Sequence, residues 1–183
     1  LGDAEYPQTF NKVLFPPGAL VYGISLILLY SMSMVYHIVR AEKAKRVLRV
    51  FDHCSIFVLI AGTYTPYLLV CMENPMRWIM FGIIWGVTVV GIVLNAINLE
   101  KFRKASMVCY VGMGWAIVFS IKTIAQAIGT GGTVLLVAGG IVYSVGIIFY
   151  AMKKYRYMHS VWHLFVLCGS VCHYLSIILY VLR

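Results

Sequence analysis

The chain has 183 residues, of which 62% are hydrophobic and 11% are charged. Because soluble domains carry about 25% charged residues, this composition excludes an ordinary soluble domain and indicates an integral membrane protein. The formal net charge of +9 does not indicate a nucleic-acid partner, because eleven of the fifteen lysines and arginines lie in three short stretches between apolar segments: 40–49, 101–104 and 153–156.

The first of six apolar segments, residues 18–39, follows residues 1–17, which we predict to be an extracytoplasmic N-terminal segment. Each apolar segment is near the ~20 residues that a helix needs to cross the hydrocarbon, and lipid requires its backbone groups to be satisfied within the helix. We therefore predict an all-α fold, a multi-pass transmembrane helical bundle of six helices within residues 18–183. The later segments are residues 51–71, 76–98, 105–126, 132–151 and 160–182.

Every second connection between these segments is basic, which is the pattern of the positive-inside rule. We predict that the connections after the first, third and fifth segments face the cytoplasm of a cell membrane. The other connections carry turn signals, Glu73-Asn74-Pro75 and Gly129-Thr130-Gly131-Gly132. Glycines inside the segments are predicted to allow close helix packing; they are Gly82, Gly86, Gly91, Gly112 and Gly114.

Three histidines lie at helix ends on the predicted cytoplasmic side: His37 closes the first segment, and His159 and His163 open the last. His159 and His163 are four residues apart and therefore lie on one side of a helix, as two ligands of one metal ion do. Three neutral imidazoles form the ligand set of a catalytic zinc, whose fourth position is left for water. We therefore predict a zinc site.

Two further residues are predicted to be catalytic: Asp52, at the start of the second segment, and Ser33, one turn before His37. Asp52 would orient a water bound to zinc and take its proton, while Ser33 would orient a ligand or donate a hydrogen bond to a developing oxyanion. These parts together describe metal-assisted hydrolysis. Their place at membrane depth favours a lipid-like substrate or ligand, with membrane lipids as partners.

Other interpretations of the histidines stay open. A single histidine near a helix end is more often an interfacial residue than a ligand, and haem is a competing cofactor. His173 lies ten residues beyond His163, roughly 15 Å along a helix, so it cannot share the same metal. We predict that His173 is a buried, hydrogen-bonded histidine. His53 points about 100° away from Asp52, which favours an interfacial role over ligation.

Several motifs resemble the hemolysin III family, the bacterial branch of the progestin and adipoQ receptor superfamily, from about residue 18 to the C-terminus. The resemblance implies seven transmembrane helices with the N-terminus inside. It also implies a zinc near the cytoplasmic side, held by histidines that match His37, His159 and His163. An aspartate that matches Asp52 would contact the water on this zinc. The related alkaline ceramidases use a similar Ser, Asp and three-His set to cleave lipid amides. The motifs are Ser33-x-x-x-His37, Phe51-Asp52-His53, Ala61-Gly62-Thr63-Tyr64-Thr65-Pro66-Tyr67 and His159-Ser160-Val161-Trp162-His163-Leu164-Phe165, with His173.

One departure from the family concerns the start of the chain. The family usually carries a Glu-x-x-Asn-x-x-x-His motif before its first helix, and Glu5 and Asn11 lack both the spacing and the histidine. The chain also begins with Leu1 rather than Met. We therefore expect its six helices to correspond to the last six of the family's seven, with the first one missing.

Three functions follow from these observations. The favoured one is a zinc-dependent hydrolase of lipid amide or ester bonds. The second is a zinc-containing membrane receptor or lipid sensor, in which zinc ties the first and last segments together. The third, which the family's name suggests, is a pore-forming cytolysin, although no segment carries a polar stripe wide enough to line a pore. The substrate and the oligomeric state stay open.

Overall fold

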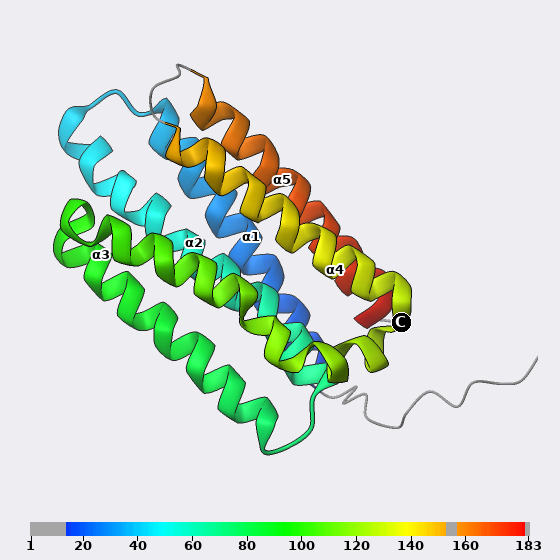
Figure 1. Ribbon diagram of the computed structural model, residues 1–183. Coiled ribbons are helices and arrows are strands. Elements are labelled where there is room, and N and C mark those ends of the chain that lie inside the picture. The colour runs from blue at the N-terminus through cyan, green and yellow to red at the C-terminus, as the bar shows by residue number, and fades with distance from the viewer. Residues whose placement is uncertain (1–13, 153–156, 182–183) are drawn as a thin grey trace, which may run out of the picture. The chain divides into compact units, whose positions relative to one another are not determined.

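The computed structural model describes residues 14–152 and 157–181, and the described chain is almost entirely helical (Figure 1). The predicted all-α, multi-pass transmembrane fold is therefore confirmed. Residues 1–13 of the predicted N-terminal segment and the basic residues Lys153, Lys154 and Arg156 lie outside the described residues. The elements are α1 (Phe15–Ile38), α2 (Glu42–Cys71), α3 (Met76–Trp115), the 3-10 helix η1 (Ala116–Ser120), α4 (Ile121–Ala151), α5 (Met158–Ser176) and the π-helical turn η2 (Ile177–Val181).

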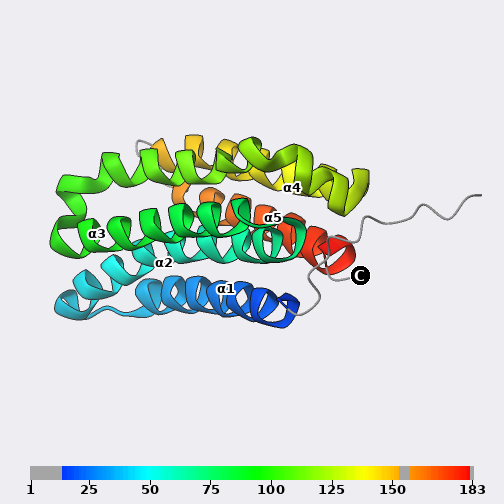
Figure 2. The ribbon, with the colours of Figure 1, turned by 90° about the horizontal axis from the view of Figure 1, so that it is seen from below.

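Four helical stretches of the described chain are long and apolar enough to cross a membrane, and one of them, Met76–Ala151, has 76 residues. A straight helix of that length would measure about 114 Å, far more than a bilayer is thick. The stretch is folded at Asn98 and at Gly129, where the backbone leaves the helical region. Figures 1 and 2 show α3 turning back on itself. Both folds lie where the sequence predicts a helix boundary.

Each fold has a local cause. Asn98 has extended backbone angles (φ −161°, ψ 95°), and its side-chain Oδ1 accepts a hydrogen bond from the backbone N–H of Lys101 at 2.9 Å. Asn98 is therefore the N-cap of the second part of α3. Gly129 has a φ of +69°, a left-handed conformation that glycine adopts without steric cost.

α2 begins at Glu42, nine residues before the predicted segment 51–71. Its first turns contain most of the basic stretch 40–49, which was predicted to be a connection between two helices. Glu, Lys, Arg and Ala are good helix formers, so the helix continues out of its apolar part. Hydropathy alone detects only the apolar part, and this explains the difference.

The chain divides into two compact units, of which one runs from residue 9 to Ile117 and the other contains the described residues from Val118 onward. In the first unit, α2 packs against both α1 and α3. Every residue from Ala61 to Met72 is buried, so the second half of α2 is the core of this unit. Large apolar side chains such as Leu20, Ile83 and Val93 are exposed on α1 and α3, as expected for surfaces that face lipid.

Small residues set the contact between α1 and α2. A side chain at Gly18 would lie 3.1 Å from the Cα of Pro66, and a side chain at Gly62 would collide with the hydroxyl of Ser25. Glycine at both positions therefore lets the two antiparallel helices approach closely. The order of the contacts, Gly18 with Pro66 and Ser25 with Gly62, also fixes which residues of α1 and α2 lie at the same level.

Tyr64 in α2 ends the regular part of α3. Its hydroxyl donates to the carbonyl of Met113 at 2.6 Å and accepts from the backbone N–H of Ile117 at 2.6 Å. In an uninterrupted helix, the N–H of Ile117 would bond the carbonyl of Met113 directly. The phenol hydroxyl is inserted between these two groups, and insertion of a side chain into this ladder is a known cause of helix distortion. The 3-10 helix η1 begins at Ala116, at this point.

In the second unit, three glycines of α4 spaced seven residues apart meet side chains of α5 and η2. A side chain at Gly132 would lie 2.9 Å from Cβ of Tyr180, one at Gly139 would collide with the ring of His173, and one at Gly146 would lie 2.7 Å from Cβ of Phe165. Large side chains of α5 and η2 therefore occupy notches in α4. Of the glycines predicted to pack closely, Gly91 meets the ring of Phe57, whereas Gly82, Gly86, Gly112 and Gly114 have no described neighbour within 4 Å.

Candidate functional site

Ser33 and His37 lie in the last turns of α1, one helical turn apart. His37 is exposed and Ser33 is half-buried. The ring of His37 packs edge-on against Tyr36, with ring centroids 4.8 Å apart, and the ammonium of Lys45 from α2 lies 5.8 Å from the centroid of the Tyr36 ring. The end of α1 is therefore held beside the first turns of α2, with the imidazole of His37 accessible.

Asp52 lies in α2 at nearly the same level as Ser33. Ser25 is level with Gly62, and because two antiparallel helices rise equally, Ser33, eight residues further along α1, is level with about residue 54 of α2. Asp52 is buried, with 8% of its surface exposed. The first unit thus brings Ser33, Asp52 and, one turn further along, His37 to the same end.

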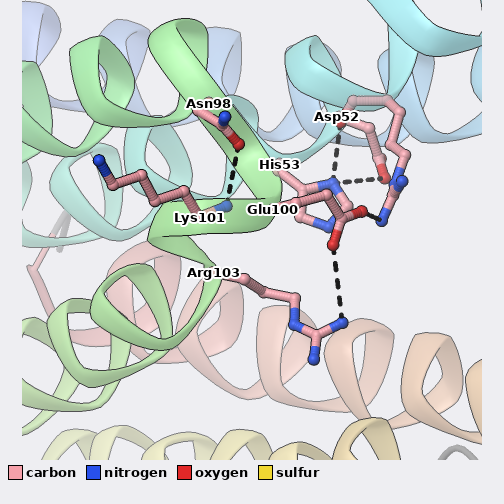
Figure 3. A network of polar contacts seen from close by, with 7 residues as sticks. Asp52, His53, Asn98, Glu100, Lys101 and Arg103 are labelled. Carbon is pink, nitrogen blue, oxygen red and sulfur yellow. Dashed lines mark hydrogen bonds and ion pairs between the residues drawn. The ribbon is translucent and has the colours of Figure 1, made fainter.

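The carboxylate of Asp52 is only weakly paired among the described residues (Figure 3). Its Oδ2 lies 3.9 Å from Nδ1 of His53, which is too long for a hydrogen bond. Nδ1 of His53 instead donates to the carbonyl of Arg49 at 2.8 Å. Asp52 therefore keeps acceptor capacity that this histidine does not use.

The segment of α2 around Asp52 is tied to the fold of α3. Arg49 forms an ion pair with Glu100 at 2.5 Å, and Glu100 also lies 4.0 Å from Arg103 (Figure 3). Further along α3, the hydroxyl of Tyr110 donates to the carbonyl of His53 at 2.9 Å. These contacts position Asp52, and they could not be predicted from the sequence, where their one signal is the acidic Glu100 beside the basic residues 101–104.

The two other predicted zinc ligands lie at the start of α5. His159 and His163 are both within α5 (Met158–Ser176), four residues apart and therefore on one side of the helix. His163 is half-buried, and the side chain of His159 lies outside the described part of the structure. His173, further along α5, is buried and its Nε2 donates to the carbonyl of Leu136 at 3.1 Å. The prediction of a buried, hydrogen-bonded His173 is confirmed.

The structure brings the five predicted site residues together in two groups. Ser33, His37 and Asp52 belong to the first unit, and His159 and His163 to the second. Among the side chains that the structure describes, no three His, Cys, Asp or Glu residues lie close enough to hold a metal ion. Each group offers donor types that suit zinc, imidazoles in both and a carboxylate in the first.

The sequence matches the family described as Haemolysin-III related over residues 13–174. It is 42% identical to Hemolysin-3 of Bacillus cereus over 162 residues, which are 88% of this chain and 74% of that protein. It is 37% identical to the Hemolysin-3 homolog of Bacillus subtilis (strain 168) over 180 residues, 98% of this chain and 83% of that protein.

A human protein is also similar. The chain is 29% identical to the monocyte to macrophage differentiation factor of Homo sapiens over 173 residues, 90% of this chain and 71% of that protein. The family match covers most of the chain, including all the predicted site residues, and it agrees with the helical membrane fold. The chain is therefore a multi-pass membrane protein that belongs to the hemolysin III family.

Proposed function

We propose that this protein is a zinc-dependent membrane hydrolase that cleaves amide or ester bonds of lipids. The observation that supports this most is the position of Asp52. It is a buried carboxylate in a membrane helix, weakly paired among the described residues and level with Ser33. An ionisable group at membrane depth is costly, so its presence indicates a function.

His37, His159 and His163 are the residues that would hold the zinc. When bound there, zinc would make water acidic enough to lose its proton near neutral pH and would polarise the carbonyl of a substrate. Asp52 would hold the attacking water and accept its proton. Ser33 would donate a hydrogen bond to the oxygen on which negative charge develops.

The basic connections after α1 and at the fold of α3 support a cytoplasmic location for this end of the first unit. The substrate would reach the residues from the bilayer, because the flanks of α1 and α3 expose large apolar side chains to lipid. A substrate with an acyl chain could remain in the hydrocarbon while its polar bond reaches Ser33 and Asp52.

Elemental analysis of the purified protein tests the zinc assignment. We expect about one zinc per chain in the wild type, and loss of most of it in His37→Ala and in His163→Ala. His53→Gln and His173→Gln serve as matched controls, since both rings bond backbone carbonyls within their own units, and they should keep the metal. Full zinc occupancy in His37→Ala and His163→Ala would show that the ligand assignment is wrong.

Turnover of a panel of lipid amides and esters tests the reaction. Asp52→Asn keeps the shape of the side chain but removes its basicity, so it should retain zinc and lose hydrolysis by about 10²-fold or more. Ser33→Ala should also retain zinc and lose part of the activity. If the wild-type protein retains one lipid stoichiometrically without converting it, the protein is a sensor and the hydrolase proposal fails.

A pore-forming cytolysin is the second candidate, and the observation that favours it is the name of the two bacterial relatives, Hemolysin-3 and Hemolysin-3 homolog. Conductance across a bilayer containing the purified protein tests it. Conductance that persists in His163→Ala, together with no lipid turnover in the wild type, would favour the cytolysin over the hydrolase.

A further inference from the structure

One end of the first unit carries a dense group of exposed cations. Some lie at the end of α1 and in the first turns of α2, and others follow the fold of α3 at Asn98. We call this group the basic end. Its exposed members are Arg40, Lys43, Lys45, Arg46, Lys101 and Lys104.

The two halves of the basic end are neighbours in space. The ion pair between Arg49 of α2 and Glu100 of α3 joins them (Figure 3). Lys45 and Arg46 lie about one turn before Arg49, Lys101 follows Glu100 directly, and Lys104 lies about one turn after Glu100. The six exposed cations therefore lie at the same end of the first unit although they come from two distant parts of the sequence.

Acidic residues at this end do not neutralise the surface. Glu100 is shared by Arg49 and Arg103, which are not members of the basic end. Glu42 is the other acidic residue of the stretches 40–49 and 100–104. The surface therefore keeps a strong excess of positive charge, which attracts a polyanion or a layer of anions.

Apolar side chains follow Lys43 along one exposed face of α2. Val47 is 57% exposed and Phe51 is 56% exposed. They follow Lys43 at intervals of four residues and therefore lie on the same face of the helix. The face changes from a cation to two apolar side chains as α2 enters its apolar part, which matches a molecule with an anionic head and hydrocarbon chains.

We propose that the basic end is a binding surface for anionic phospholipids. The phosphate groups contact the exposed lysines and arginines, and the acyl chains lie against Val47 and Phe51. A soluble phosphate would use only the cations and would leave the apolar face uncovered, so the observations favour a lipid. The proposal does not depend on zinc or on hydrolysis, because it rests on the charge and exposure of residues outside the catalytic set.

Native mass spectrometry of the purified full chain tests this surface. The protein is titrated with phosphatidylglycerol or with phosphatidylcholine of the same acyl chains. We expect about tenfold tighter binding of phosphatidylglycerol, because each cation near a charged headgroup adds a modest attraction, and we expect higher salt to weaken this preference. Equal affinity for the two lipids overturns the proposal.

Substitutions separate the surface from the rest of the molecule. Lys43→Gln with Arg46→Gln, and separately Lys101→Gln with Lys104→Gln, should each reduce the preference for phosphatidylglycerol by several-fold. Lys122→Gln removes an exposed cation from α4 and should leave the preference unchanged. If both double variants keep the wild-type preference, the basic end is not the binding surface.

Two further arms identify the ligand. Millimolar inorganic phosphate should not displace phosphatidylglycerol, and displacement would show that the surface binds soluble anions instead. Val47→Ala should weaken phosphatidylglycerol binding, whereas Val89→Ala, which is equally exposed at 58%, should not. An unchanged affinity in Val47→Ala would remove the acyl-chain contact on which the choice of a lipid rests.

Discussion

At the scale of single residues, the hydroxyl of Tyr64 bonds two backbone groups at the point where the regular ladder of α3 is interrupted. It bonds the carbonyl of Met113 and the N–H of Ile117 at the end of α3. Tyr64 is only 5% exposed, so water does not easily replace it. A single side chain in α2 thus determines where α3 stops being regular.

Tyr64→Phe should lower the free energy of unfolding by about 1–3 kcal/mol, because it removes the hydroxyl that accepts from the N–H of Ile117 while keeping the ring. Thermal or denaturant unfolding in detergent measures this change, and amide hydrogen exchange at Ile117 should become faster. Tyr36→Phe, in the accessible last turn of α1, is the control and should have little effect. If Tyr64→Phe is as stable as the wild type, the inserted hydroxyl does not support α3.

Glu100 illustrates a weaker contact at the same scale. Its ion pairs with Arg49 and Arg103 join α2 to α3, but Glu100 is 60% exposed and solvent or headgroups can screen the pair. Glu100→Gln should therefore lower the free energy of unfolding by no more than about 1 kcal/mol. Unfolding of this variant in low and high salt measures the effect, and a much larger loss would indicate that the pair is shielded.

At the scale of elements, the fold of α3 depends on the cap that Asn98 forms. Asn98→Ala removes the bond from Oδ1 to the N–H of Lys101 and should cost about 0.5–2 kcal/mol. Asn98→Asp can form the same cap and should retain most of the stability. Unfolding of the two variants in parallel measures the difference, and equal losses would mean that the amide acts in some other way.

Adjacent glycines in α4 give a matched pair of substitutions. Gly139→Ala places a methyl group against the ring of His173, while Gly140 has no described neighbour within 4 Å. We expect Gly139→Ala to cost about 1–3 kcal/mol by overpacking. Gly140→Ala should be neutral or stabilise by up to about 1 kcal/mol, because alanine favours the helix. Circular dichroism during thermal unfolding compares them, and identical stabilities would contradict the notch at Gly139.

Elements were predictable from the sequence where hydropathy and turn residues act together. The ends of α1 and the folds at Asn98 and Gly129 follow from apolar length, from the basic residues near position 101 and from glycine. The early start of α2 and the 3-10 helix at Ala116 were not predictable from hydropathy. The first depends on the helix propensity of residues outside the membrane, and the second depends on a long-range contact with Tyr64. The presence of glycine alone did not predict close packing, which depends on whether that face of the helix meets a partner: Gly82 and Gly86 have no described neighbour within 4 Å.

At the scale of the whole molecule, the proposed zinc would stabilise the folded state, because a ligand that binds only this state raises its free energy of unfolding. At free zinc one hundred times above its Kd, the gain is about 2.7 kcal/mol. Chelation should remove this gain from the wild type and zinc should restore it. His163→Ala should unfold alike with and without chelator, and a zinc effect that persists in this variant would contradict its role as a ligand.

The candidate site was predictable only in part. Sequence spacing was enough to pair His159 with His163 and to place Ser33 one turn from His37, because these relations are local to a helix. The matching levels of Ser33 and Asp52 needed the contacts of Gly18 and Gly62, which bring two helices together. The support that Asp52 receives from Glu100 and Tyr110 is longer in range still, and no local pattern reports it.

The seven-residue spacing of Gly132, Gly139 and Gly146 also restricts sliding of α5 along α4. A shift by one turn, about 5.4 Å, would press the large side chains of α5 and η2 against residues such as Leu136 and Tyr143 instead of glycine. Only a displacement of seven residues, roughly 10.5 Å, would bring them back into register. The glycine spacing therefore favours a single register of α5 on α4, and this register fixes the level of His163 along α4.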